Sequence, residues 1–459
     1  MYILKEGTER TRGRDAQSNN IEAAISVADA VRSCLGPRGM DKMLVDSLGD
    51  ITVTNDGATI VKEIEIKHPA AKMIAEVAKT QNDEVGDGTT TAVIVAGELL
   101  KQARALIPDV HPTIIAYGYH VARGHAISTL RAMATQVNVR DRKRLESIAA
   151  TALTGKIPPT TRAQLADIVA SAITAIADDG GRVEIDTENV MLLKKRGEPV
   201  SSTELLQGIA IDKERVHEAM PKSVSDARIA LLNVALELKK TEVDAKIKIT
   251  HSGEREAFLS HEEATIRRMV ESVKSSGANV LFCQKGIDDL AQHFLAKEGI
   301  YAVRRVKKSD MEKLARATGG RMIQNLSDLT HTDLGRARLV DERKYGDDRV
   351  TFVTGCKNPK AVSILVRATN DETLDELERS LQHALDAVSA AAEDGLVLPG
   401  GGAPEAEVAL ALRKKASELS GREQFAVLAF AKAVEIVPRT LAENAGAHPI
   451  DSLVAIRVA

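Results

Sequence analysis

The sequence is poor in the residues that build small secreted or membrane-bound scaffolds. It has no tryptophan, 5 tyrosines, 6 phenylalanines and 3 cysteines in 459 residues. Cys34, Cys283 and Cys356 lie far apart and form no C-x-x-C pair, so neither a zinc site nor a disulfide framework is indicated. No run of about eighteen apolar residues and no leader-like start occurs. We therefore expect a cytoplasmic protein with reduced thiols and no membrane partner.

No region concentrates charge of one sign. The chain carries 65 acidic and 62 basic residues, a net charge of -3, and the two signs are interspersed throughout. Nucleic-acid-binding proteins need a basic stripe or domain, so we expect no nucleic-acid partner. The chain is also longer than one hydrophobic core usually organises, which predicts two or three domains.

Apolar periodicity divides the chain into helical ends and a mixed middle. Helical spacing occurs at residues 20–35, 69–106, 111–133, 372–392 and 421–433. In the middle, strand-like runs alternate with helical runs at residues 229–232, 278–283, 286–297, 300–303 and 309–318. This order predicts a multidomain α and α/β protein in which one domain is inserted into another.

A charged helix is expected at residues 254–276, just before the mixed region. Ile266, Met269, Val270 and Val273 form one stripe on it. The simplest interpretation is an amphipathic helix packed on its own domain.

A loop of small residues, Gly86-Asp87-Gly88-Thr89-Thr90-Thr91, precedes the apolar run at residues 92–96. A helix that begins there would direct backbone N–H groups and its positive dipole end at the loop, which suits phosphate. Asp87 could bind Mg²⁺, which prefers carboxylate and phosphate oxygens. The alternative is a threonine N-cap after a flexible turn. Neither a Walker A pattern nor a G-x-G-x-x-G fingerprint is present.

Four glycine-containing motifs together resemble group II chaperonins, the family of archaeal thermosomes and the eukaryotic cytosolic chaperonin. They occur in the order and with the spacing of that family: Leu35-Gly36-Pro37, Asn55-Asp56-Gly57, Gly86-Asp87-Gly88-Thr89-Thr90 and Gly400-Gly401-Gly402. The similarity covers essentially the whole chain. It implies an ATP-dependent chaperone subunit that binds unfolded or partly folded proteins in a double-ring chamber of like or related subunits, with ATP and Mg²⁺ as cofactors.

The resemblance also implies a chaperonin-like division of the chain. Residues 1–142 and 398–459 would form a helical equatorial ATP-binding domain, and residues 143–208 and 359–397 a small intermediate domain. Residues 209–358 would form an α/β apical domain for substrate. Its helical protrusion, at about residues 245–277, would be a built-in lid.

Particular site residues follow from the same resemblance. Those implied to bind nucleotide are Leu35, Gly36, Pro37, Gly57, Asp87, Gly88, Thr89, Thr90, Thr91, Gly155, Lys156 and Gly401. Asp87 would hold Mg²⁺, Lys156 would sense the terminal phosphate, and Gly401 would lie near the nucleoside. Asp56 would help to orient the attacking water.

The second catalytic carboxylate of the family is replaced in this chain, where His383 stands at the matching position. The apolar stripe of its helix places His383 on the polar side: Leu374, Leu377, Leu381, Ala384, Leu385 and Val388. Beside Asp56 and phosphates we expect a protonated imidazole, which would bind phosphate rather than deprotonate water. Asp386, three residues on, is a possible substitute base, and a surface histidine without a role is the alternative.

The chain stops at Ala459, whereas members of the family continue to a closing strand. That continuation carries a carboxylate for the nucleoside and a strand that joins neighbouring subunits. A chain that ended at Ala459 would therefore bind nucleotide and assemble into rings more weakly, and a sequence that continues beyond Ala459 is the alternative. Three hypotheses follow: an ATP-hydrolysing chaperonin subunit, a chaperonin-derived subunit that binds nucleotide or partners but hydrolyses ATP poorly, and a stand-alone phosphate-handling enzyme.

Overall fold

A computed structural model describes residues 11–47, 49, 51–178, 183–238, 252–357 and 359–458, with the backbone alone at residues 252–259. The chain divides into two compact units, residues 1–162 with 382–459 (unit 1) and residues 163–381 (unit 2). Helices α7 (Pro159–Ile176) and α11 (Asp371–Asp394) each begin in one unit and end in the other. The finer five-segment division stays a prediction.

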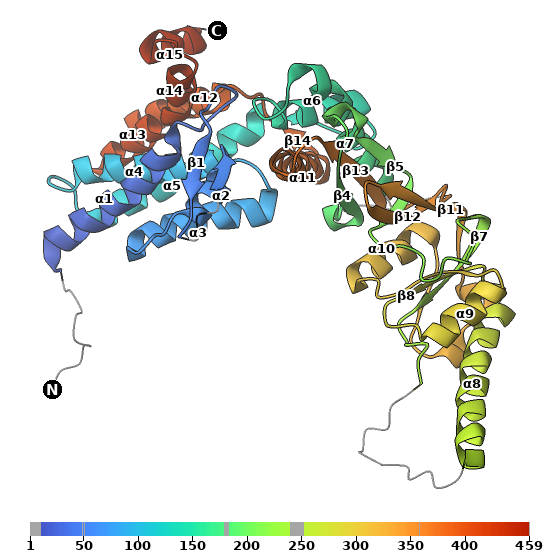
Figure 1. The fold of residues 1–459 in the computed structure, drawn as a ribbon. Coiled ribbons are helices and arrows are strands. Elements are labelled where there is room, and N and C mark those ends of the chain that lie inside the picture. Colours follow the sequence, from blue (N-terminus) through green and yellow to red (C-terminus); the bar gives the residue numbers. More distant parts are fainter. Residues whose placement is uncertain are drawn as a thin grey trace, which may run out of the picture. The chain divides into compact units, whose positions relative to one another are not determined.

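Unit 1 is mainly helical (Figure 1). Its other helices are α1 (Gly13–Arg32), α2 (Gly57–Glu63), α3 (Pro69–Val85), α4 (Thr89–Leu106), α5 (Pro112–Met133), α6 (Arg142–Ala152), α12 (Ala403–Ser417), α13 (Glu423–Val434), α14 (Ile436–Asn444) and α15 (Pro449–Val458). Strands β1 (Lys42–Val45) and β2 (Ile51–Thr54) form a hairpin, and β3 (Thr135–Gln136) pairs with β14 (Leu396–Val397).

Helix α4 is central to the core of unit 1, where it packs against α1, α3 and α13. Gly97 allows the close approach of α1, because a Cβ added there would lie 2.2 Å from the Cβ of Ala28. Val93 and Ile94 of α4 are fully buried in this core. The close packing fixes the position of the N-terminus of α4.

Unit 2 contains two sheets. The larger has the strand order β6-β12-β11-β7-β8-β9, with β10 beside β7, and the smaller has the order β4-β13-β5. The strands are β4 (Val190–Arg196), β5 (Glu204–Leu206), β6 (Gly208–Ile211), β7 (Ser223–Leu232), β8 (Val280–Cys283), β9 (Tyr301–Val303), β10 (Met322–Ile323), β11 (Gly335–Tyr345), β12 (Asp348–Thr354) and β13 (Val362–Ala368). Helix α10 (Lys308–Thr318) contributes to the core on one face of the larger sheet, and α8 (Ser252–Ser275) and α9 (Asp289–Lys297) to the core on the other.

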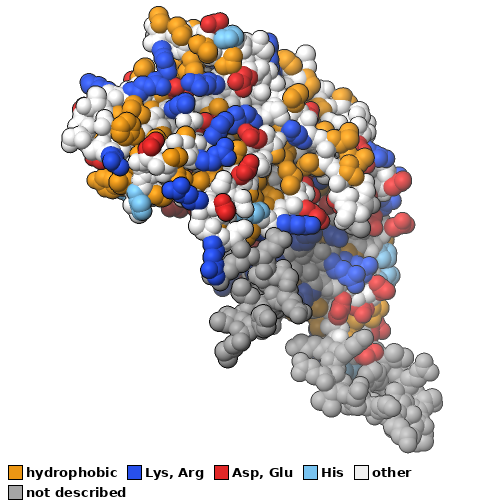
Figure 2. All heavy atoms as spheres, turned by 90° about the vertical axis from the view of Figure 1, so that its left-hand side faces the viewer, with side chains coloured by type: hydrophobic (Ala, Val, Ile, Leu, Met, Phe, Trp, Pro, Cys, Tyr) orange, Lys and Arg blue, Asp and Glu red, His pale blue; other side chains and the backbone are white. Residues whose placement is uncertain are grey.

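The predicted fold class, multidomain α and α/β, is confirmed by this architecture. The stripe on α8 is also as predicted, since Ile266, Val270 and Val273 are buried against the larger sheet. Residues 245–251 of the expected protrusion lie outside the described residues, so the lid remains a prediction. Basic, acidic and hydrophobic side chains are interspersed over the face in Figure 2. Among the described residues, no helix combines the length and apolarity that a membrane span requires.

Several sequence expectations about elements were wrong. The helical run at residues 69–106 is two helices, because Gly86 and Gly88 both adopt left-handed backbone conformations, with φ of 70° and 75°. Strand β13 was missed, and residues after 360 were taken as helical. All seven of its residues are buried, so it has no alternating pattern, and such a run cannot be told from a buried helix by periodicity.

Candidate functional site

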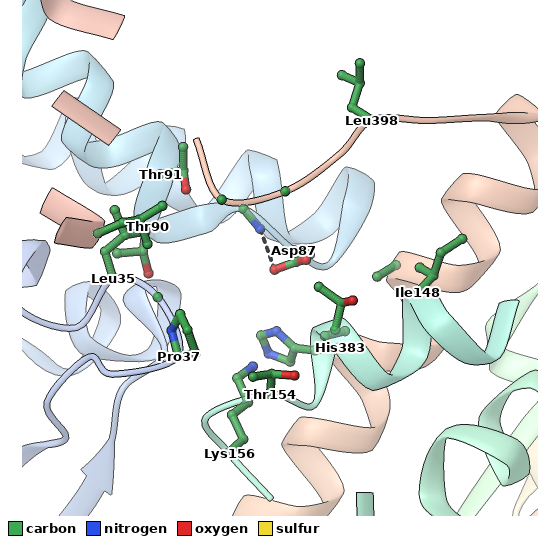
Figure 3. Close-up of a pocket in the computed structure, with 18 of the residues that line it drawn as sticks. Leu35, Pro37, Asp87, Thr90, Thr91, Ile148, Thr154, Lys156, His383 and Leu398 are labelled. Atoms are coloured by element: carbon green, nitrogen blue, oxygen red, sulfur yellow. Dashed lines mark hydrogen bonds between the residues drawn. The ribbon is translucent and has the colours of Figure 1, made fainter. Parts of the chain in front are cut away.

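A cavity of about 750 Å³ in unit 1 collects nearly all the predicted site residues (Figure 3). Predicted residues that line it are Leu35, Gly36, Pro37, Asp56, Asp87, Gly88, Thr89, Thr90, Thr91, Lys156, His383 and Gly401. They come from six separate stretches of the chain. Gly57, Gly155 and Asp386 do not line the cavity but lie directly behind its wall, as described below.

The loop between α3 and α4 presents Asp87 between two left-handed glycines. Gly86 ends α3, Gly88 is the N-cap of α4, and Thr89 is the first helical residue. The threonine N-cap of our alternative interpretation is therefore wrong. No side chain caps α4, so its first N–H groups remain available at the cavity wall. The Asp87 carboxylate accepts a hydrogen bond from the N–H of Gly88 at 2.7 Å.

Asp56 is the N-cap of α2 and is held by several hydrogen bonds. Its Oδ2 accepts bonds from the N–H and the hydroxyl of Thr59, both at 2.7 Å, and its Oδ1 lies 3.4 Å from the Thr89 hydroxyl. Burial by itself would raise the pKa of Asp56, but His383, the bonds from Thr59 and the charge of Lys156 together lower it. The side chain is therefore an oriented carboxylate at neutral pH.

Lys156 follows α6 in the turn Thr154-Gly155-Lys156. Gly155 has φ of 87°, and a Cβ there would lie 2.9 Å from the Cα of Pro37, so this turn packs directly on the Leu35-Gly36-Pro37 loop. Within the part of the chain that the structure describes, the Lys156 ammonium group makes no ion pair or hydrogen bond. Figure 3 shows it beside the imidazole of His383, with the Asp87 carboxylate across the cavity.

His383 lies on the polar side of α11, as the apolar stripe predicted, because all six stripe residues are buried. It lines the cavity and is only partly accessible. Its catalytic role and the alternative, a surface histidine without a role, both stay predictions. Burial and then the charge of Lys156 lower its pKa, against the opposing effect of Asp56, Asp87 and Asp386. The protein's own groups thus favour the neutral imidazole, and the protonated form expected beside phosphates stays a prediction.

Two predicted residues, Asp386 and Gly57, lie behind the cavity wall and contact the loop between α3 and α4 or the start of α4. The Asp386 side chain packs on the phosphate loop, since a Cβ on Gly86 would lie 2.3 Å from the Cβ of Asp386. Its Oδ1 accepts a hydrogen bond from Gln382 at 2.9 Å. Gly57 is needed for close contact with α4, because a Cβ there would lie 2.4 Å from the hydroxyl oxygen of Thr90. Both residues therefore support this segment and do not line the cavity.

Other residues of the cavity wall were not among the predicted site residues, although Asn55 and Gly400 belong to two of the four motifs. They comprise Cys34, Asn55, Thr135, Arg144, Ser147, Ile148, Thr151, Ala152, Thr154, Ala387, Val397, Leu398, Pro399, Gly400 and Leu441. Ser147, Ile148 and Thr151 lie at the i, i+1 and i+4 positions of α6. Their helical spacing just before the Thr154-Gly155-Lys156 turn was the available signal.

Helix α14 closes one side of the site by a contact that no local pattern reveals. The Asn444 side chain donates to the carbonyl oxygens of Arg32 and Leu35 at 3.2 and 2.8 Å. A Cβ on Gly36, whose φ is 87°, would lie 2.3 Å from a methyl carbon of Leu441. The C-terminal part of the chain thus fixes the turn that follows α1.

These groups form a site suited to a polyanion. The free N–H groups of α4 and the Lys156 ammonium group favour negative charge. Asp87 can accept a hard cation, and Asp56 and His383 offer a carboxylate and a neutral imidazole to the same space. Among the described residues no cluster of three or more potential ligands holds a metal by itself. A cation here would need further oxygens from a ligand or water.

Comparison with known proteins identifies the family. The model of the TCP-1/cpn60 chaperonin family matches residues 27–459. The chain belongs to this family. Thermosome subunit beta of Archaeoglobus fulgidus is 56% identical over 461 residues, which cover 100% of this chain and 85% of that protein. Thermosome subunit alpha of Thermoplasma acidophilum is 55% identical over 459 residues, covering 100% and 84%.

Membership of the family confirms the resemblance deduced from the four glycine motifs. The chain is a group II chaperonin subunit, and its fold is the multidomain chaperonin fold. The hypothesis of a stand-alone phosphate-handling enzyme from another family is wrong.

Proposed function

We propose that this chaperonin subunit binds Mg·ATP in the unit 1 cavity and couples its hydrolysis to the folding of unfolded or partly folded proteins. The subunit would work in a double ring with like or related subunits, as the name thermosome subunit in its relatives supports. The observation that carries the proposal is the Asp87 loop at the uncapped N-terminus of α4, with an unpaired Lys156 opposite.

The residues present fit Mg²⁺ and a nucleotide. Asp87 offers one exposed carboxylate at the cavity wall, and Mg²⁺ is commonly held by one or two carboxylates together with phosphate oxygens and water. When bound, the ion would neutralise charge on phosphate oxygens. Gly400 and Gly401 leave open space, since a Cβ on either meets no atom within 4 Å. This open wall suits the nucleoside.

Each protein group has a definite task in the proposed hydrolysis. The N–H groups of Thr89, Thr90 and Thr91 bind phosphate oxygens, and Lys156 binds the terminal phosphate. Asp56, oriented by Thr59, accepts a hydrogen bond from the attacking water. His383 is the candidate base, because a neutral imidazole can accept a proton near pH 7. Asp386 positions the loop that carries Asp87.

One observation favours the second hypothesis, a subunit that binds nucleotide but hydrolyses it poorly. Lys156 lies beside His383 and lowers its pKa, so it disfavours the imidazolium that would form when His383 takes a proton. We therefore propose that hydrolysis is slow relative to binding.

The domain roles belong to the same proposal. Residues 1–142 and 398–459 would be the equatorial domain, residues 143–208 and 359–397 the intermediate domain and residues 209–358 the apical domain. Helix α8 would carry the lid. The role of the lid requires that this helix continue beyond its contacts with the larger sheet.

Thermal melts and phosphate release together test the proposal. Millimolar Mg·ATP should raise the melting temperature, because a ligand at about 100 times its Kd stabilises the native state by about 2.7 kcal/mol. Asp87→Ala should abolish the shift without lowering the melting temperature of the free protein. Asp83→Ala is the matched control, because it removes an exposed aspartate of α3 outside the cavity lining. Steady-state phosphate release then separates hydrolysis from binding alone. A correctly folded sample without any thermal shift would refute the nucleotide site.

A further inference from the structure

Two arginines of unit 2 face each other on neighbouring strands without an acidic partner. Arg228 of β7 and Arg336 of β11 are opposite residues in an antiparallel pair, which places their Cβ atoms about 4.5–5.5 Å apart. Both are exposed, and neither side chain makes an ion pair or hydrogen bond with any residue in the described ranges. Directly opposed like charges destabilise a strand pair, so an anion bound between them would relieve the repulsion.

These arginines line a hollow of about 560 Å³ on the surface of the larger sheet. The other lining residues are Ser225, Asp226, Ala227, Asn279 and Ala337. Side chains two residues apart on a strand share a face, so Arg228 and Arg336 share the face of Ala230 and Leu334, which are buried in the same core as α8 and α9. On this face of the larger sheet, α8 and α9 contribute to the core that contains Ala230 and Leu334, and the hollow lies two residues away along each chain segment.

The backbone that carries Arg228 is held in place. The side-chain oxygen of Asn279 accepts a hydrogen bond from the N–H of Arg228 at 2.7 Å, and its amide nitrogen donates to the carbonyl of Asp226 at 3.3 Å. Asp226 has φ of 48°, a conformation that aspartate tolerates better than most residues. The Cα atoms that carry the two arginines thus lie at a fixed spacing, so only the side chains must be ordered on a ligand.

The surroundings favour a carboxylate over a phosphate group. Asp226 would repel a doubly charged group more strongly than a singly charged one. Phosphate sites also commonly use free backbone N–H groups at a helix start or turn, whereas the Arg228 N–H is already bonded to Asn279 and no helix begins among the lining residues. Each guanidinium can donate to one carboxylate oxygen, and such charged hydrogen bonds are strong.

We propose that Arg228 and Arg336 form a clamp for a carboxylate side chain in an acidic segment of a protein partner. The clamp lies in unit 2, separate from the nucleotide cavity of unit 1, and it does not depend on the nucleotide. Its ligand is identified by chemistry alone: a glutamate or aspartate carboxylate presented on an exposed peptide.

Calorimetric titration of the full chain with end-blocked tetraglutamate tests the clamp. Tetraglutamate should bind and end-blocked tetraglutamine should not. Arg336→Gln should weaken binding at least about tenfold, because it removes a charge-assisted hydrogen bond, and Arg336→Glu should abolish it. The matched control is Arg338→Gln, which removes the same charge two residues along β11 but outside the hollow lining. It should change affinity by no more than about twofold.

Three results would overturn the clamp. The first is equal weakening by Arg336→Gln and Arg338→Gln, which would indicate general attraction to a basic surface. The second is the absence of tetraglutamate binding by the unaltered chain at millimolar concentration. The third is tighter competing binding of inorganic phosphate at the same arginines, which would refute the carboxylate. If Arg336→Gln does not fold, Arg228→Gln provides the same comparison.

Discussion

Lys195 of unit 2 is buried and Lys156 of unit 1 is partly buried, and within the described residues only Lys195 is paired. Lys195, on β4 and 6% exposed, donates to Asp212 at 2.9 Å and to Asp348 at 2.7 Å. Lys156 makes no ion pair or hydrogen bond within the described residues and lies on a cavity wall. Ion pairs within unit 2 thus offset the desolvation of Lys195, whereas the partial desolvation of Lys156 is not offset by an ion pair within the described residues.

The difference separates groups that hold the fold from groups that face a ligand. A shielded charge is unfavourable unless it is paired. Lys195 finds its partners inside unit 2, where it connects β4 to the start of β12 and the end of β6. Lys156 and the uncapped start of α4 have no such partners, so their interactions remain available to a polyanion. A lysine of the first kind should matter for stability and one of the second kind for binding.

The largest expected effect comes from substituting His383, which lines the same cavity as Lys156 and the start of α4. We expect His383→Asp to raise steady-state ATP turnover, since a correctly placed base typically contributes about 10²–10⁴-fold. Lys156 stabilises an ionised carboxylate at this position, so the aspartate would be present in its deprotonated, proton-accepting form at neutral pH. Phosphate release at saturating Mg·ATP measures the rate, and thermal shift measures binding, which should change far less.

His383→Asn is the matched control for this experiment, because it is polar and similar in size to aspartate but cannot act as a base. Similar turnover in the Asp and Asn variants would show that the base is not limiting. A high rate in the unaltered chain would instead identify His383 or Asp386 as a competent base and contradict slow hydrolysis.

The second prediction compares the two lysines directly. Lys195→Met should lower the free energy of unfolding by about 1–2 kcal/mol, because it removes charged hydrogen bonds but leaves two carboxylates that solvent can reach, at 61% and 66% exposure. Lys156→Met should change that free energy by less than about 0.5 kcal/mol but reduce the Mg·ATP thermal shift. Urea denaturation of both variants provides the measurement. If both variants lost the same free energy of unfolding, Lys156 would stabilise the fold as much as Lys195 does, contrary to this prediction.

The smallest expected effect is on the pH dependence of stability. Burial and Lys156 lower the pKa of His383, so its contribution to stability is present above its unfolded pKa of about 6.5 and is lost as the pH falls through the lower folded value. The stability difference between the unaltered chain and His383→Asn should therefore narrow between about pH 7 and pH 5. When both proteins also carry Lys156→Met, the stability difference between them should change less with pH, because Lys156 no longer lowers the pKa of His383. A difference that widens toward low pH would mean that the folded pKa is raised.

Local patterns were enough for much of the fold. The apolar stripe of α11 correctly placed His383 on the polar side, because helical periodicity decides which residues share a face. Strands β8 and β9 with helices α9 and α10 appeared as short apolar runs separated by amphipathic helices. Helix α12 was not recognised, and β13 was mistaken for helix, because a fully buried segment lacks the contrast between faces on which periodicity depends.

The amino-acid sequence by itself determined the family and the place of the small-residue loop before α4, since glycine spacing and the order of four motifs are properties of the chain. It did not determine which distant segments close the cavity. The contact of Leu441 with Gly36, the packing of Gly155 on Pro37 and the position of Asp386 behind Gly86 each join residues far apart in sequence. Tertiary structure also decided the direction in which the pKa of His383 shifts, because burial and the charge of Lys156 lower it against the opposing effect of Asp56.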